Sequence, residues 1–372
     1  MMSSLDEARR EINDVDKQMA ELFTRRMVAA ETIVSYKAEH GLPILDKARE
    51  EQVVERNAAM IPDPIIRNYY VSFIRNTMAV SRSYQEQLLK GMRVAYSGVE
   101  GAFAHIASKR IYPTGQAFSY KSFDDAYRAV ENGECHCAVL PIENSFAGEV
   151  GQVVDLLFSG SLHISNVYDL SIRHQLMAAP HATIETVKNV CSHPQALQQC
   201  ADFIRRNDLE PIACANTAVA AKQVADSGDP TLAAIASEET ARLYGLQILQ
   251  RNINESAWNT TRFAVLTRAD NRPTDIVGMR TMLFFSVSHQ SGSLAEAISI
   301  IGKHGFNMLS LRSRAQKDLL WQYYFAVEME GNAYTDAGTA MLDELSQCCD
   351  KLKVVGVYPD DRSINAFEED SQ

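Results

Sequence analysis

Two cations in the first long helical segment are spaced to bind one small dianion. Arg26 and Lys37 are eleven residues apart. This is about three helical turns, so their side chains emerge on nearly the same face with α-carbons roughly 16 Å apart. Arg26 follows Leu22 by four residues on the apolar stripe, where a solvated charge is not expected. Each cation alone could be an ordinary surface charge, but together they can hold two carboxylates of one ligand.

A second pair of polar residues lies on the apolar face of a later helical segment. Ser81 and Gln85 are four residues apart and continue the apolar line of Ile66, Tyr70 and Ile74. We therefore expect polar side chains from two helices to converge inside a helical bundle.

In the middle of the chain, several apolar strands end in a polar residue that opens a helix. These junctions are Ser97–Gly101, Ser192–Gln195, Asn216–Ala218 and Ser237–Glu239. Helix N-termini gathered along the carboxyl edge of a sheet offer unpaired N–H groups to an anion. The pattern predicts a cleft that binds a carboxylate.

The helices that position the first cluster follow from apolar spacing and helix breakers. We expect one helix over about residues 5–39, a second capped by Asp46, and a third from about Pro64 to Leu89. Three helices, one of them very long, cannot bury their apolar faces as a compact monomer. An interlocked helical dimer is expected.

Short strands alternating with helices between Arg93 and Arg268 predict an open α/β sheet. The expected strands are Arg93–Ser97, Cys137–Pro141, His163–Tyr168, Val187–Ser192, Leu232–Ser237 and Arg262–Thr267. After an expected linker at 271–274, residues 281–358 read as strand, helix, strand, strand, helix, strand, which is a ferredoxin-like α+β order. Its expected strands are Met282–Ser288, Asn307–Arg314, Gln322–Glu328 and Val354–Tyr358.

Length and composition limit the class of protein. The 372 residues suit two or three domains, and the net charge of -11 argues against nucleic acid or an anionic membrane as a partner. No apolar run could span a membrane and the N-terminus does not read as a secretory signal, so a cytoplasmic location is expected. The seven scattered cysteines are expected to be reduced thiols, and neither they nor Cys135-His136-Cys137 predict a metal site.

Eight polar positions within residues 1–90 form one pattern, namely Arg9, Arg26, Lys37, Asp46, Arg49, Glu50, Ser81 and Gln85. In these positions the segment resembles the all-helical chorismate mutases. The resemblance implies that all eight bind chorismate, that Lys37 and Gln85 act as catalytic donors to its ether oxygen, and that Arg9 reaches into a partner's site. A Claisen rearrangement needs only a compact conformer and stabilisation of developing charge, which these residue types supply.

Three strings in residues 92–268, Pro141–Ser145 with Gly148, Ser192–Leu197 and Thr261–Phe263, resemble prephenate dehydratase. The resemblance implies an α/β domain of two lobes around a cleft, similar to type II periplasmic binding proteins. The implied prephenate-binding residues are Glu143, Asn144, Ser145, Ser192, His193, Gln195, Thr217, Thr261, Arg262 and Phe263.

Thr261 matches the essential threonine of that family. A neutral hydroxyl is too weakly acidic to act alone, so we expect it to donate or relay a hydrogen bond at the leaving hydroxyl of prephenate. Arg262 could hold a carboxylate or form an ordinary ion pair. Glu143 and Asn144 could orient substrate or cap the following helix, and His193 could bind substrate or simply start a helix.

Gly292–Ala295 and Leu311–Ala315 match, the second only in part, the motifs of ACT domains, which residues 279–360 resemble. Arg312 replaces an acidic residue of the second motif and Ala315 replaces a proline. The resemblance implies an effector site for L-phenylalanine at Gly292, Ser293, Leu294, Ser313 and Arg314.

These resemblances predict a cofactor-free, metal-free enzyme of L-phenylalanine biosynthesis with chorismate and prephenate as substrates, inhibited by L-phenylalanine and active as a homodimer or larger assembly. Two alternatives remain open. One is a prephenate or arogenate dehydratase with a non-catalytic helical dimerisation domain, and the other is a cytoplasmic small-molecule sensor.

Overall fold

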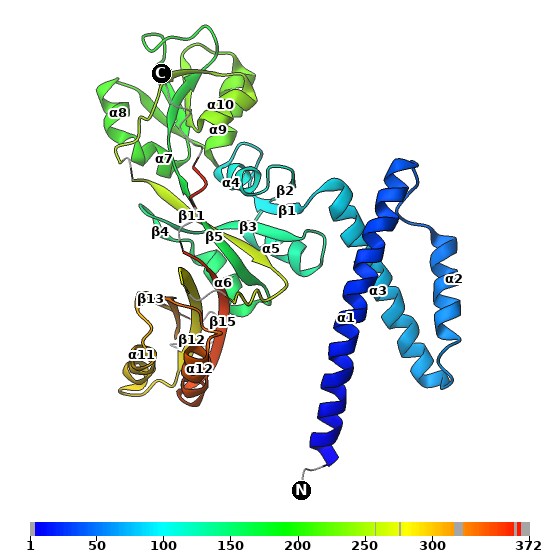
Figure 1. Ribbon diagram of the computed structural model, residues 1–372. Helices are drawn as coiled ribbons and strands as arrows, with labels where there is room; N and C mark the ends of the chain where they lie inside the picture. The colour runs from blue at the N-terminus through cyan, green and yellow to red at the C-terminus, as the bar shows by residue number, and fades with distance from the viewer. Residues whose placement is uncertain (1–3, 257, 275–276, 316–322, 361–362, 366–372) are drawn as a thin grey trace. The chain divides into compact units, whose positions relative to one another are not determined.

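The computed structural model describes residues 4–256, 258–274, 277–315, 323–360 and 363–365 (Figure 1). The chain separates into two compact units, Met1–Met92 and Arg93–Gln372.

The first unit contains the three predicted helices, α1 (Ser4–Glu39), α2 (Lys47–Ala58) and α3 (Pro64–Lys90). The predicted cap of α2 is confirmed, because the Asp46 side chain accepts a hydrogen bond from the backbone N–H of Arg49. Asp63 caps α3 in the same way, Pro64 occupies its first turn, and Gly91 ends it with a positive φ of 78°. Local sequence chemistry therefore sets where these helices begin and end.

The long helix α1 leaves most of its apolar stripe uncovered. Only Ala30 and Val34 of α1 are buried, and the small core of the unit is centred on Val54, Ile74 and Met78. The uncovered apolar side chains in the first two thirds of α1, each at least 42% exposed, are Leu5, Ile12, Val15, Met19, Leu22 and Phe23. So long a contiguous apolar stripe is typical of a surface that another chain covers.

The second unit begins with an α/β domain of two lobes. The first lobe comprises β1 (Arg93–Ser97), α4 (Phe103–Ile111), β2 (Gln116–Tyr120), α5 (Phe123–Glu131), β3 (Cys137–Asn144), β4 (Gly148–Glu149), α6 (Gly151–Ser159), β5 (His163–Ser171) and β11 (Thr260–Thr267). Its strands are ordered β2-β1-β3-β11-β5, with β4 paired to β3. Strand β11 runs antiparallel to both β3 and β5.

The second lobe is a five-stranded sheet ordered β10-β6-β9-β7-β8. Its elements are β6 (Gln175–Ala178), β7 (Asn189–Ser192), α7 (Pro194–Gln199), α8 (Ala201–Arg206), β8 (Glu210–Ala213), α9 (Thr217–Ser227), β9 (Leu232–Ala236), α10 (Glu238–Tyr244) and β10 (Gln247–Gln250). The chain crosses between the lobes twice, after β5 and before β11. The predicted two-lobed α/β architecture is confirmed.

Five strands of the two lobes escaped the sequence prediction. They are β2, β4, β6, β8 and β10, and none is longer than five residues. β2, β8 and β10 carry no fully buried residue, so they lack the apolar run that marks a central strand. Pairing with neighbouring strands, rather than local sequence, determines them.

The C-terminal domain has the predicted ferredoxin-like order. Its elements are β12 (Met279–Val287), α11 (Ser293–Lys303), β13 (Met308–Ala315), β14 (Tyr323–Glu330), α12 (Asp336–Cys348) and β15 (Cys349–Pro359), and its sheet is ordered β13-β14-β12-β15. Gln322, expected to begin the third strand, lies outside the described residues.

One face of this C-terminal sheet shares a core with the first lobe. Phe284, Tyr324 and Val355 are buried in the same cluster as residues of β3, α5 and α6, and the ring of Phe158 stacks on that of Tyr324 with centroids 3.9 Å apart. β15 also comes so close to β5 that a Cβ on Gly356 would lie 2.1 Å from the carbonyl oxygen of Ile164. The two domains are therefore joined by apolar packing as well as by the chain.

We predict that Gly356→Ala lowers the thermal unfolding midpoint of this unit. The added methyl group must push β15 away from the backbone of β5, and overpacking of this kind costs about 1–3 kcal/mol. The control is Gly302→Ala in α11, where a Cβ meets no atom within 4 Å and where alanine favours the helix. Thermal unfolding is measured by circular dichroism. Equal unfolding midpoints for the two variants would contradict the close contact between β15 and β5.

Candidate active sites

The helical unit gathers a polar cluster on its inward faces. Ser81 and Gln85 are both buried on α3, and the Gln85 Nε2 lies 3.5 Å from the Ser81 Oγ. Burial lowers the pKa of the half-buried Arg26 guanidinium, and the nearby negative charge of Glu50 opposes this shift. Among the described residues, neither Arg26 Nη1 nor Gln85 Oε1, both buried, has a hydrogen-bond partner. The cluster retains hydrogen-bonding capacity for a ligand.

Three further predicted residues of this unit, Lys37, Asp46 and Arg49, each contact a nearby group of the same chain. Lys37 donates to the carbonyl oxygen of Ile44 at 2.6 Å, which holds the loop after α1 against the helix. Asp46 caps α2, and Arg49 is exposed and lies 3.4 Å from Gln52. Lys37 is therefore part-buried in the last turn of α1, whereas Arg49 faces solvent in an isolated chain.

Arg9 does not join the cluster within one chain. It precedes Arg26 by 17 residues on α1, a separation of about 25 Å along the helix axis. Sequence reasoning also missed Arg82, which forms an ion pair with Glu50. Its spacing of one residue from Ser81 gave no signal, because adjacent helical residues point in different directions.

The two-lobed domain contains a cavity of about 300 Å³ between its lobes. Five of the predicted prephenate-binding residues line it: Asn144, His193, Gln195, Thr217 and Thr261. The first lobe supplies Asn144 from the end of β3 and Thr261 from β11. The second lobe supplies the others from the beginnings of α7 and α9, as the strand-to-helix junctions predicted.

The direction of the hydrogen bonds around Thr261 is fixed by backbone groups. The Asn144 Oδ1 accepts from the backbone N–H groups of Phe146 (3.0 Å) and Ala147 (2.9 Å), so its Nδ2 is the group that faces the Thr261 Oγ1 at 2.9 Å. Because the amide donates to Oγ1, the threonine hydroxyl keeps its own proton for another acceptor. That proton is available to a molecule in the cavity.

The same chain of hydrogen bonds continues to His174. The Asn144 Nδ2 also donates to Asn259 Oδ1 (3.0 Å), and the Asn259 Nδ2 donates to Gln199 Oε1 (2.9 Å). The His174 Nε2 lies 2.9 Å from the same Gln199 oxygen and must be protonated to donate to it. Burial lowers the pKa of His174 and also that of His193, which favours neutral rings in the cleft.

Three further predicted residues lie outside the cavity. Two of them are hydrogen-bonded to the backbone, and the third is buried in the core. The Ser145 hydroxyl accepts from the N–H of Thr260 and donates to the carbonyl of Trp258, closing a turn. The Ser192 hydroxyl donates to the carbonyl of Ile235. Phe263 is a core side chain, 2% exposed. Their positions fit structural roles rather than contact with substrate.

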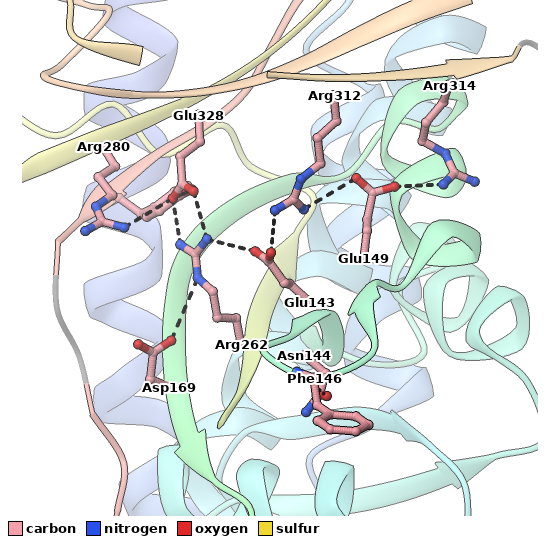
Figure 2. A network of polar contacts seen from close by, with 11 residues as sticks. Glu143, Asn144, Phe146, Glu149, Asp169, Arg262, Arg280, Arg312, Arg314 and Glu328 are labelled. Atoms are coloured by element: carbon pink, nitrogen blue, oxygen red, sulfur yellow. Dashed lines mark hydrogen bonds and ion pairs between the residues drawn. The ribbon is translucent and has the colours of Figure 1, made fainter. Parts of the chain in front are cut away.

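Glu143 and Arg262 also lie outside the cavity, in an ion-pair network with the C-terminal domain (Figure 2). Successive residues of a strand point to opposite faces, so Arg262 lies behind Thr261 and Glu143 behind Asn144. Arg262 donates two hydrogen bonds to Glu328, at 2.8 and 2.6 Å, and Glu143 pairs with Arg312. The ordinary ion pair considered for Arg262 is therefore present, and a direct contact with prephenate does not fit its position.

Sequence reasoning missed several residues that line the cavity. They are Phe103, Phe123, Ile172, His174 and Gln199. Gln199 follows Gln195 by four residues on α7, so helical spacing could have identified it. His174 lies where the chain passes from one lobe to the other, and no motif marks it.

A second cavity, of about 460 Å³, lies in the C-terminal domain. Its walls are residues 286–291 with Leu294, Tyr323, Phe325 and Asp350. Of the five predicted effector residues only Leu294 lines it, although Gly292 opens α11 beside it with a φ of 90° and the Ser293 Oγ lies 3.1 Å from the Ser288 Oγ. Ser313 is exposed on β13, and Arg314 is held by Glu149 and Asp155.

The described residues carry neither a cluster of metal ligands nor a membrane-spanning helix. No group of three or more His, Cys, Asp or Glu side chains is arranged to hold a metal ion. Within the same part of the chain, no helix combines the length and apolar character that membrane crossing requires. All seven cysteines are free thiols.

Comparison with protein families defines the class. Residues 8–86 match the family of type II chorismate mutases, and residues 94–271 match the family of prephenate dehydratases. The matched segments correspond to the helical unit and the two-lobed domain. The fold and the two polar clusters thus define a chain that joins a chorismate mutase domain to a prephenate dehydratase domain.

Known relatives cover the chain more fully. The bifunctional chorismate mutase/prephenate dehydratase of Enterobacter agglomerans is 30% identical over 96% of this chain and 96% of its own length. A solved structure described as GqqA, a novel type of quorum quenching acylase, is 30% identical with a TM-score of 0.67 and covers 72% of this chain and 98% of its own. Prephenate dehydratase from Arthrobacter aurescens, solved with L-Phe, shares the fold at 23% identity, with a TM-score of 0.68 and coverage of 72% and 90%. The chain belongs to the bifunctional chorismate mutase/prephenate dehydratase family.

Proposed function

We propose that the chain rearranges chorismate to prephenate in the helical unit and converts prephenate to phenylpyruvate in the two-lobed domain, as steps of L-phenylalanine biosynthesis. The observation that carries this proposal is that each family match coincides with polar groups whose hydrogen-bonding capacity is unused. These groups are Arg26 and Gln85 in the first domain and the Thr261 hydroxyl in the second. Neither reaction requires a cofactor.

In the helical unit, the rearrangement breaks an ether C–O bond and forms a C–C bond within one molecule. Arg26 binds a carboxylate of chorismate through its guanidinium fork. Lys37 donates to the ether oxygen, where negative charge develops. Gln85 donates to it through an N–H of Nε2, because its unpaired Oε1 can only accept. Lys37 can keep its bond to Ile44 while doing so, because an ammonium group has three donors. Glu50 balances the charge of Arg26 and accepts from the substrate hydroxyl.

The site is completed by a second copy of the chain. Arg9 lies too far along α1 to reach its own cluster, and the uncovered stripe on α1 provides the apolar surface for a partner helix. In such a dimer Arg9 enters the partner's site, Arg49 loses its exposure to solvent, and both cations bind the second carboxylate.

In the two-lobed domain, loss of carbon dioxide sends the electrons of the C–C bond into the ring, which becomes aromatic as hydroxide leaves. The leaving oxygen must acquire a proton. Thr261 donates a hydrogen bond to that oxygen, because Asn144 already occupies its acceptor side. Gln195 and the N-terminus of α9 at Thr217 bind the carboxylates of prephenate. His193 and His174 remain neutral and add no charge that would oppose the departure of carbon dioxide.

The C-terminal domain is an ACT-type regulatory domain that binds L-phenylalanine. Its cavity lies at the start of α11, where backbone N–H groups suit the carboxylate of an amino acid, and its apolar lining includes Leu294, Tyr323 and Phe325. The relative from Arthrobacter aurescens was solved with this amino acid. Ser313 and Arg314 act outside this cavity.

We predict that Gln85→Glu confines mutase activity to acidic pH. A carboxylate donates a hydrogen bond only when it is protonated, so near neutral pH the variant should lose one donor to the developing oxyanion, about 10²- to 10³-fold in rate. The measurement is chorismate consumption between pH 4.5 and 8, with phenylpyruvate formation from added prephenate as the control for an intact second domain. A variant profile that parallels the unaltered protein would exclude a donor role for Gln85.

We predict that Thr261→Ala leaves chorismate consumption intact and causes prephenate to accumulate, because only the dehydratase loses its donor. Thr261→Ser keeps the hydroxyl and should retain much more activity. Thr260→Ala, at the preceding position of β11, is the matched control. The assay follows prephenate and then phenylpyruvate by ultraviolet absorbance. Equal rates of phenylpyruvate formation by the alanine and serine variants would show that the proton comes from another group.

We predict that L-phenylalanine binds the whole protein and inhibits the dehydratase more than the mutase, since the C-terminal domain packs on the dehydratase lobe. Coupling of about 1–3 kcal/mol would change substrate affinity roughly 5- to 150-fold. Calorimetric titrations with phenylalanine, tyrosine and tryptophan measure this, with Leu294→Arg to block the cavity and Ser299→Ala on α11 as control. Absence of heat and of inhibition at millimolar phenylalanine would leave the domain a purely structural role.

A further inference from the structure

The residues directly behind the dehydratase donors are charged and paired. In the β3–β11 ladder Thr261 lies opposite Asn144, and Arg262 lies opposite Glu143. Because side chains alternate along a strand, the first pair faces the cavity and the second faces the C-terminal domain. The Arg262 Nη1 lies 3.5 Å from the Glu143 Oε2.

The pairing of β11 with β3 is irregular next to Arg262. Its register shifts between Arg262 and Phe263, so that Arg262 pairs with Glu143 but Phe263 pairs with Pro141. Such a bulge interrupts pairing and increases local twist. The irregularity is confined to the β3 side of β11, because pairing with β5 stays in register from Thr260 to Val265.

Contacts from the C-terminal domain hold Arg262. Glu328 on β14, only 5% exposed, accepts two hydrogen bonds from Arg262 and one from the Tyr358 hydroxyl at 2.8 Å. Arg280 adds a second positive charge at 3.6 Å. Burial alone would raise the pKa of Glu328, but the hydrogen bond and charge of Arg262 outweigh it and lower that pKa. Glu328 is thus an anion fixed by three groups.

A second contact holds Glu143. Arg312 on β13 donates to Glu143 and lies 3.6 Å from Glu149 (Figure 2). Arg314, two residues further on the same strand and the same face, binds Glu149 at 2.7 Å. Arg312 therefore brings a positive charge from β13 to both Glu143 and Glu149.

We propose that Arg312 and Glu328 of the C-terminal domain are positioning residues of the dehydratase site, acting through Glu143 and Arg262 on the orientation of Asn144 and Thr261. This rests on the proposed dehydratase function. Loss of Arg312 leaves Glu143 with only the 3.5 Å contact to Arg262 in place of a direct hydrogen bond, and loss of Glu328 removes both hydrogen bonds that hold Arg262. Displacement of a donor by about 1 Å costs roughly 10²-fold in rate.

The principal test uses Arg312→Gln in the full-length chain, because this part-exposed side chain can be replaced without opening the core. With prephenate as substrate, kcat should fall about 10- to 100-fold while KM changes less than about twofold, since the substrate-binding groups remain. Arg312→Lys, which keeps the charge, should recover most of the loss. Glu344→Gln is the matched control, because Glu344 is ion-paired to Lys303 in the same domain but lies outside the network.

A double-mutant cycle isolates the contact. If Arg312 acts through Glu143, then Glu143→Gln combined with Arg312→Gln should lose no more kcat than the worse single variant. Additive losses of kcat would overturn the positioning role. So would a kcat for Arg312→Gln equal to that of the Glu344→Gln control, even if the unfolding temperature of Arg312→Gln falls. Phenylpyruvate formation by the unaltered chain separately tests the proposed function, so the two failures are distinguishable.

Discussion

The side-chain amide of Asn144 has one orientation available, because two backbone N–H groups bind its oxygen. The hydrogen bonds that run from Asn144 along the cavity between the lobes depend on that constraint. The Asn144 nitrogen is therefore a donor to Thr261 and Asn259, which leaves the threonine proton unused. Because the Asn259 oxygen accepts from Asn144, its nitrogen donates to Gln199. A turn of the backbone therefore determines which atom in the cleft can give up a hydrogen bond.

Strand alternation extends this constraint to the next domain. The two strands that carry Asn144 and Thr261 have a second face, and charges on that face contact β13 and β14. Apolar contacts, such as the stack of Phe158 on Tyr324, close the same boundary. The cavity beside α11 and the Thr261 side chain thus belong to domains joined by one contact of apolar and charged side chains.

Much of this arrangement could be predicted from sequence, and the failures have physical reasons. Helix spacing and caps gave the three N-terminal helices and the inward position of Arg26, because these depend on neighbours within a few residues. The two-residue period of a strand separates Thr261 from Arg262, but it cannot say which of them faces the cleft. That depends on packing against β14, more than sixty residues away. Arg82, His174 and the short edge strands were not predicted for the same reason, because residues distant in the sequence determine their positions.

The shared core between β15 and the first lobe means that the two domains are not separable modules, although the linker at 271–274 suggests a place to cut. Removing everything after that linker would expose the ring of Phe158, the backbone of β5 beside Gly356, and the charges of Glu143 and Arg262. Such a fragment would expose to solvent a partly apolar sheet face that is prone to aggregation. A point change confined to the cavity beside α11 would leave this sheet face covered, whereas deletion of the whole domain would cost solubility.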